Sequence, residues 1–134
     1  MTSVITNQTV TPLLTVPTPQ FPPGSDVMVR QIELPPGDPG LGPHRHSGPV
    51  FGYVLEGEIL FELEGEAPYK LSAGDAFSEP GGDVIHYQAA NLLPDRRSVF
   101  VAFMVCAPGV EMITMVGPEE LAAKAASRLP YRGI

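Results

Sequence analysis

Two of the three histidines in this 134-residue sequence lie one residue apart, at His44 and His46. In an extended strand, residues i and i+2 project from the same face, so both imidazoles would point one way and Arg45 the other. The third histidine, His86, lies in a second strand-like segment after the loop at 80–82. If the two segments face each other, three imidazoles meet at one point. Such a ligand set suits divalent iron, zinc, nickel, copper or manganese and leaves coordination positions open for catalysis.

The histidine pair also has a simpler interpretation. Three histidines are close to the background number for a chain of this length, and an H-x-H pair on a strand can be a polar edge. A motif of this kind is a hypothesis until its structural context supports it.

Composition limits the classes of partner. Apolar residues make up 43% and charged residues 17% of the chain, which fits one globular domain with a sizeable core. The net charge of −7 argues against nucleic acid and against an anionic membrane surface as partners. We therefore expect a small-molecule substrate or ligand. Cys106 is the single cysteine, so we expect no intramolecular disulfide and a buried, inert thiol.

The N-terminal residues lack the basic and apolar regions of a signal peptide. No apolar stretch approaches the length needed to span a membrane. We therefore expect a cytoplasmic protein that does not associate with membranes.

Sixteen prolines and fourteen glycines indicate many short elements joined by turns, which is typical of an all-β sandwich or barrel. We expect a single domain made of a proline-rich arm over 1–25, a barrel over 26–116 and a C-terminal helix and tail over 117–134. Strands are predicted over residues 26–34, 50–56, 58–64, 69–71, 76–79, 84–90, 98–106 and 110–116.

The helix should start at Pro118 and end at Pro130, with an apolar stripe that docks on the barrel formed by Leu121, Ala125 and Leu129. The predicted strand at 98–106 is apolar on both faces, as a strand between the barrel interior and another sheet or subunit would be. Together with the proline-rich arm, it predicts a homodimer.

Residues 26–116 resemble the small single-domain cupins, a family of jelly-roll β-barrels. Two motifs carry the resemblance. The first combines an H-x-H pair with a later glycine, represented here by His44, His46 and Gly57. The second is represented by Gly74, Pro80, Gly82, His86 and Asn91. The resemblance implies a cupin jelly-roll fold and a metal site on the three histidines.

The chain departs from the family pattern at two places. Val50 stands where the family has its metal-binding glutamate, and valine cannot bind a metal. The spacings from Gly82 to His86 and from His86 to Asn91 are each one residue longer than in the family. A longer loop or a bulge would keep the His86 ring inside the barrel, whereas a regular strand would turn it away. We expect a longer loop or a bulge, with the His86 ring inside the barrel.

The resemblance implies either dioxygenase chemistry, as in several three-histidine cupins, or isomerase or lyase chemistry. A neutral ligand set would leave the charge of the metal uncompensated and favour an anionic, oxygen-chelating substrate or a bound hydroxide. A non-catalytic binding module and a scaffold that has lost its metal are the alternatives.

Two further residues are candidates for catalytic roles. Glu79 could replace the missing carboxylate ligand, support a ligand or act as a general base, although an acidic residue entering a turn is usually solvated. Gln88 would share the face of His86 in a regular strand and could bind substrate; otherwise it is an amide held by the backbone at the barrel mouth. Arg30 could bind a substrate carboxylate if it faced inward, but a surface position is commoner. Tyr53 and Tyr87 should point outward and pack.

Overall fold

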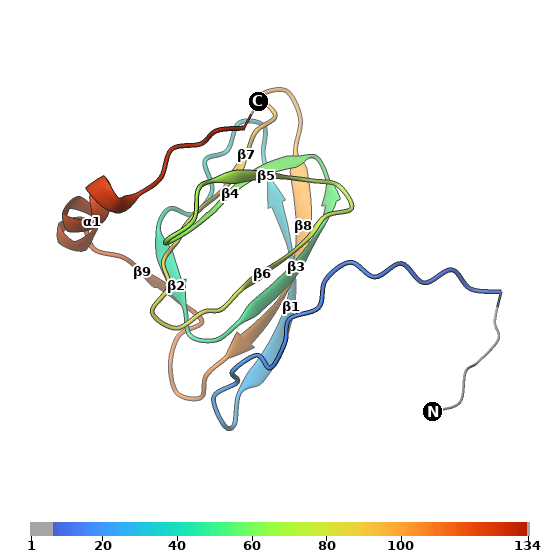
Figure 1. Ribbon diagram of the computed structural model, residues 1–134, viewed down its shortest axis with the longest axis horizontal. Helices are drawn as coiled ribbons and strands as arrows, with labels where there is room; N and C mark the ends of the chain where they lie inside the picture. Colours follow the sequence, from blue (N-terminus) through green and yellow to red (C-terminus); the bar gives the residue numbers. More distant parts are fainter. Residues whose placement is uncertain (1–6, 134) are drawn as a thin grey trace.

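Two antiparallel sheets face each other and enclose the interior of the protein in a computed structural model that describes residues 7–133 (Figure 1). The described residues form nine strands: β1 (Asp26–Leu34), β2 (His44–His46), β3 (Val50–Glu56), β4 (Glu58–Leu63), β5 (Tyr69–Ser72), β6 (Ala76–Glu79), β7 (His86–Asn91), β8 (Ser98–Cys106) and β9 (Ile113–Met115). The expected all-β jelly-roll fold is confirmed. Residues 1–6 of the predicted arm and residue 134 of the predicted tail lie outside the described residues.

One sheet has the strand order β1-β8-β3-β6 and the other β5-β4-β7-β2-β9. Long-range pairing dominates, since β8 pairs along its whole length with β1 and also with β3. Alternate residues of the strands point inward and form the main apolar core, whose most deeply buried members include Val54, Ile59 and Phe61. The strands that carry His44, His46 and His86 are neighbours in the five-stranded sheet, so the topology brings the three histidines together.

Gly57 is required at the turn between β3 and β4, where the chain passes from one sheet to the other. Its φ of +89° lies in the left-handed region, and a Cβ there would approach the Ser98 hydroxyl oxygen to 2.1 Å. A side chain at this position would be both strained and obstructed. The backbone conformation and the close approach of Ser98 therefore explain why this position is glycine.

The C-terminal segment begins as predicted but docks differently. Helix α1 (Pro118–Lys124) has proline in its first turn and continues as a short 3-10 helix, η1 (Ala125–Ser127). The predicted apolar stripe is wrong in part: Leu121 packs against a small core cluster, whereas Leu129 is 48% exposed. Ion pairs hold the segment to the barrel instead; they are Arg45–Glu120, Lys124–Glu64 and Arg128–Glu62.

The remaining boundaries follow the sequence prediction closely, with two exceptions. β7 begins at His86, two residues later than predicted, and β9 covers only three residues of the segment 110–116. The part of the arm that the structure describes has no strand and lies on the side of the barrel opposite α1 (Figure 1). No helix among the described residues is long and apolar enough to span a membrane.

Candidate metal centre

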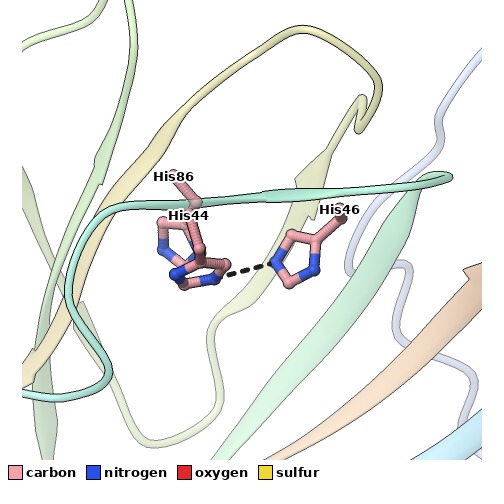
Figure 2. A group of neighbouring side chains, drawn as sticks. All are labelled: His44, His46 and His86. Carbon is pink, nitrogen blue, oxygen red and sulfur yellow. Dashed lines mark hydrogen bonds between the residues drawn. The ribbon is translucent and has the colours of Figure 1, made fainter. Parts of the chain in front are cut away.

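The three histidines converge inside the barrel. His44 and His46 project from β2, and His86, on β7, pairs directly with His44 in the sheet. One ring nitrogen from each residue lies within 4.8 Å of the others, and all three side chains are buried. Figure 2 shows the rings turned toward one another. Arg45 points the other way and forms an ion pair with Glu120, as strand alternation predicts.

A bulge in β7 keeps His86 in this cluster. Glu62 of β4 pairs with Gln88, but the next residue, Leu63, pairs with His86, so Tyr87 is an extra residue in the strand. The bulge takes up the additional residue between His86 and Asn91, and the loop at 80–85 takes up the one before His86. The expectation that the longer spacing leaves His86 inward is confirmed.

The same bulge corrects the expected position of Gln88. Because the strand is irregular, Gln88 does not share the face of His86, and its amide donates a hydrogen bond to Glu62 at 2.8 Å instead. Its side chain does not line the cavity beside the histidines. Only its main-chain oxygen contributes to the cluster, by accepting a hydrogen bond from Nε2 of His86 at 2.9 Å.

Glu79 supplies a carboxylate to the cluster. It ends β6, is 4% exposed and places Oε1 3.2 Å from Nε2 of His46 and 3.1 Å from Nδ1 of His86. In the β3–β6 pair, Glu79 lies directly opposite Val50. The alternative of a solvated turn residue is therefore wrong for Glu79.

Hydrogen bonds to main-chain carbonyl groups show which ring nitrogen of His44 and of His86 carries a proton. Nδ1 of His44 lies 2.6 Å from the Gly42 carbonyl and must carry a proton to donate there, which leaves Nε2 as a lone-pair donor. By the same argument, the bond from His86 to the Gln88 carbonyl places a proton on Nε2 of His86, which leaves Nδ1 as a lone-pair donor in the neutral ring. That nitrogen and Glu79 Oε1 are buried, 3.1 Å apart and without a hydrogen-bond partner.

His46 completes the arrangement. Its Nε2 lies 3.2 Å from Nε2 of His44 and 3.2 Å from Oε1 of Glu79 (Figure 2 marks the first contact). A single proton on this nitrogen could satisfy one of these neighbours. The electron-pair donors of the cluster are thus Nε2 of His44, Nε2 of His46, Nδ1 of His86 and Oε1 of Glu79. When the imidazoles are neutral, at most one proton lies among these atoms, so they repel one another. A bound cation would offset this repulsion.

Electrostatics determine the charge of two of the four side chains, His44 and Glu79. Burial, followed by the neighbouring imidazoles, lowers the pKa of His44 to about 4, against the opposing effect of its hydrogen bond to Gly42. Burial alone would raise the pKa of the Glu79 carboxyl, but His46 and His86 outweigh it and bring the pKa to about 2. Near neutral pH, His44 is therefore uncharged and Glu79 ionised.

A cavity of about 130 Å³ adjoins the four side chains. Its apolar walls include Ile32 of β1 and Phe100 and Met104 of β8. The sequence did not show which apolar residues of the strand at 98–106 face the interior; Phe100 and Met104 do, whereas Phe103 is 43% exposed.

The other residues considered from the sequence lie outside this cavity. Arg30 is exposed, and its guanidinium contacts the sulfur of Met28. Tyr53 lies along a groove on the outer face of β3, and Tyr87 is buried against Ile85 and Val116 on the outer face of its sheet.

The region that holds the site matches a known protein family. Residues 30–92, which carry the three histidines and Glu79, match the family model of the cupin domain. The chain belongs to the cupin family. No curated protein shows significant sequence similarity to this cupin.

Solved structures resemble this cupin over much of its length. It is 35% identical to KdgF from Halomonas sp. over 58% of this chain and 68% of that chain, with a TM-score of 0.47. It is 26% identical to an RmlC-like cupin from Shewanella frigidimarina over 62% of this chain and 68% of that one, with a TM-score of 0.51. The DMSP lyase DddQ from Ruegeria pomeroyi is 24% identical over 69% and 44% of the two chains, with a TM-score of 0.53, and shares the fold alone.

Proposed function

We propose that this cupin binds a divalent metal through His44, His46, His86 and Glu79. The observation that carries the proposal is the convergence of three buried imidazoles, with one ring nitrogen of each within 4.8 Å of the others, beside the buried Glu79 carboxylate, whose Oε1 lies 3.1 Å from Nδ1 of His86 and 3.2 Å from Nε2 of His46. An anionic oxygen and a lone-pair nitrogen at this distance repel each other unless a cation or an extra proton is bound between them. Imidazole and carboxylate together suit iron, zinc, nickel or manganese.

The charge of this ligand set points to the substrate. One carboxylate and three neutral imidazoles leave a dication with a net charge of about +1. A bound metal would act as a Lewis acid on a chelating oxygen group. The residues of the chain would fix the orientation of that group, exclude water through the apolar walls and keep Glu79 ionised. We therefore propose a small anionic, oxygen-chelating substrate, turned over by dioxygenase or by isomerase or lyase chemistry.

A non-catalytic small-molecule-binding module is the second candidate. Among the side chains that line the cavity, only those of the four proposed ligands are polar. If all four bind the metal, no separate acid or base remains in the cavity to transfer a proton. This observation favours chemistry that needs no additional protein base, or no chemistry at all.

Metal analysis of protein purified without a metal-affinity tag tests the proposal. Wild-type protein should hold stoichiometric metal, His86→Ala should hold none, and Glu79→Gln should hold less. The control is Glu66→Gln, which alters an exposed carboxylate in the turn after β4. Metal-free wild-type protein after loading with iron, zinc, nickel and manganese in turn would overturn the proposal.

Oxygen uptake then separates the reaction classes. Protein loaded with iron under anaerobic conditions is exposed to oxygen and a panel of small organic acids and diketones. Oxygen consumption with a substrate indicates a dioxygenase, turnover without it indicates an isomerase or lyase, and saturable binding without turnover indicates the binding module.

We also propose a homodimer in the cytoplasm. The arm carries the exposed residues Leu13 and Leu14, which line an apolar groove together with Phe51, Tyr53 and Phe103 on the outer face of the four-stranded sheet. A second copy would cover this surface. A dimeric mass at micromolar concentration that becomes monomeric in Phe103→Asp, but not in Leu55→Asp, is the expected result; a monomeric wild type would contradict it.

A further inference from the structure

We infer that the cavity selects a chelator with a single negative charge whose remaining part is small and apolar. The inference rests on the proposed function, because it places the chelating group at His44, His46, His86 and Glu79. It goes further by excluding a class of substrates: acids that carry a second charged group away from the chelating oxygens, such as dicarboxylates and sugar acids with several charges.

The lining of the cavity carries the inference. Fourteen residues line it, and the ten that are not proposed ligands are all glycine or apolar. None of the lining residues is a lysine or an arginine. The two arginines nearest in sequence to the lining residues are engaged elsewhere, Arg30 with Met28 and Arg45 with Glu120. A second carboxylate on the substrate would therefore be taken out of water without a partner.

Glu79 adds to this selection. Its carboxyl group is buried beside the cavity and is the one acidic side chain among the residues that line it. An anionic substrate group that does not reach the metal would face this carboxylate across apolar walls, where charges interact more strongly than in water. Only the chelating group has a cation to offset its charge.

The volume of the cavity limits the size of the substrate. The cavity measures about 130 Å³. An apolar protein cavity of about 150 Å³ binds benzene, so this slightly smaller one accommodates roughly five or six non-hydrogen atoms. A short aliphatic chain beside the chelating group fits, and an added ring does not. Phe100 and Met104 form part of the wall that sets this limit.

A substitution at Leu41 can change which anionic substrates the cavity binds. Leu41 lines the cavity, yet it is 57% exposed, so it lies at the rim. A lysine there can keep its ammonium group in water while reaching toward the cavity. Leu55 is a matched control, because it is 48% exposed on β3 and does not line the cavity.

Three 2-oxo acids test charge and size separately. 2-Oxopentanoate and 2-oxoglutarate share the chelating group and the carbon chain, and differ in a terminal methyl group against a carboxylate. 2-Oxo-5-phenylpentanoate keeps the single charge and adds a ring. Binding is followed in protein loaded with Co²⁺, through the visible spectrum of the metal and by calorimetry, so no turnover is required.

We expect 2-oxopentanoate to bind at least about tenfold more tightly than either of the other acids, because an unpaired buried carboxylate and an oversized ring are both unfavourable. Leu41→Lys should strengthen binding of 2-oxoglutarate severalfold, and Leu55→Lys should not. Equal or tighter binding of 2-oxoglutarate by the wild type, or no binding of any of the three, would overturn the inference while leaving the metal site intact. Failure of the wild type to bind Co²⁺ would instead contradict the proposed function and remove the inference with it.

Discussion

Glu79 lies directly opposite Val50 in the β3–β6 pair, and its carboxylate, 3.2 Å from His46 and 3.1 Å from His86, enters the histidine cluster from the neighbouring strand. Directly opposed residues on one face of an antiparallel pair have their Cβ atoms about 4.5–5.5 Å apart, so a side chain from either strand can reach a common point. A carboxylate at either position could therefore reach the histidine cluster.

This relationship predicts that the carboxylate can be exchanged between strands. Glu79→Val should weaken metal binding at least about tenfold, because the site loses its only negative ligand. Adding Val50→Glu to that variant should restore most of the affinity. Metal dissociation constants of both variants and the wild type provide the measurement. A double variant that folds but binds metal no better than Glu79→Val would show that the two positions are not equivalent.

Gln88 should have little influence on the metal. Its side chain pairs with Glu62, and only its main-chain oxygen touches His86. Gln88→Ala is therefore expected to leave metal affinity within about twofold and to lower the free energy of unfolding by about 1 kcal/mol, the typical net contribution of one hydrogen bond. Competition with a chelator and urea denaturation measure the two quantities. A large loss of metal affinity would place the Gln88 side chain in the site after all.

The metal-free protein should lose stability in mild acid. The pKa of His44 is about 4 in the folded protein and ordinarily 6.5, so the folded state binds fewer protons than the unfolded state between these values. The contribution is present above pH 6.5 and is lost as the pH falls toward 4. Linkage gives a decrease of about 2 kcal/mol between pH 7 and pH 5. Glu79 adds little in this window, because its pKa of about 2 keeps it ionised.

Urea denaturation of the metal-free protein at pH 7 and pH 5 checks this expectation. His44→Asn is the control, because it removes the titrating ring and should show a smaller decrease between the two pH values. Identical decreases in both proteins would mean that His44 does not carry the effect.

The C-terminal segment should stabilise the sheet that carries His86. Arg128 forms an ion pair with Glu62, which is only 2% exposed, and its guanidinium lies 4.1 Å from the centre of the Tyr87 ring. Arg128→Ala would leave a buried carboxylate without its cation, and we expect a loss of about 2 kcal/mol in the free energy of unfolding, less than for a fully buried pair because Arg128 is partly exposed. Arg132→Ala, an exposed position four residues later, is the control. Equal stability of the two variants would contradict this role.

Local patterns were sufficient for most of the strands and for the three histidines. β1, β3, β6 and β8 have the predicted bounds, because turn residues and alternation mark them within a few residues. The convergence of His44, His46 and His86 depended on the resemblance to cupins, since a histidine forty residues away has no local signal of its own.

The errors arose where pairing across the sheet decides the outcome. The bulge at Tyr87 is a matter of register between β4 and β7, so alternation along one strand placed Gln88 on the wrong face. The burial of Glu79 depends on β6 lying beside β3, which no property of the local sequence reports. Similarly, the helix stripe could not show that three ion pairs would hold the C-terminal segment.

The most direct test of the central claim is a crystal structure of the metal-loaded protein with anomalous diffraction measured at the absorption edge of the bound metal. We expect one peak about 2.0–2.2 Å from Nε2 of His44, Nε2 of His46 and Nδ1 of His86, with a Glu79 carboxylate oxygen as a further ligand. A peak that lies elsewhere, or the absence of a peak from crystals soaked in excess metal, would contradict the account.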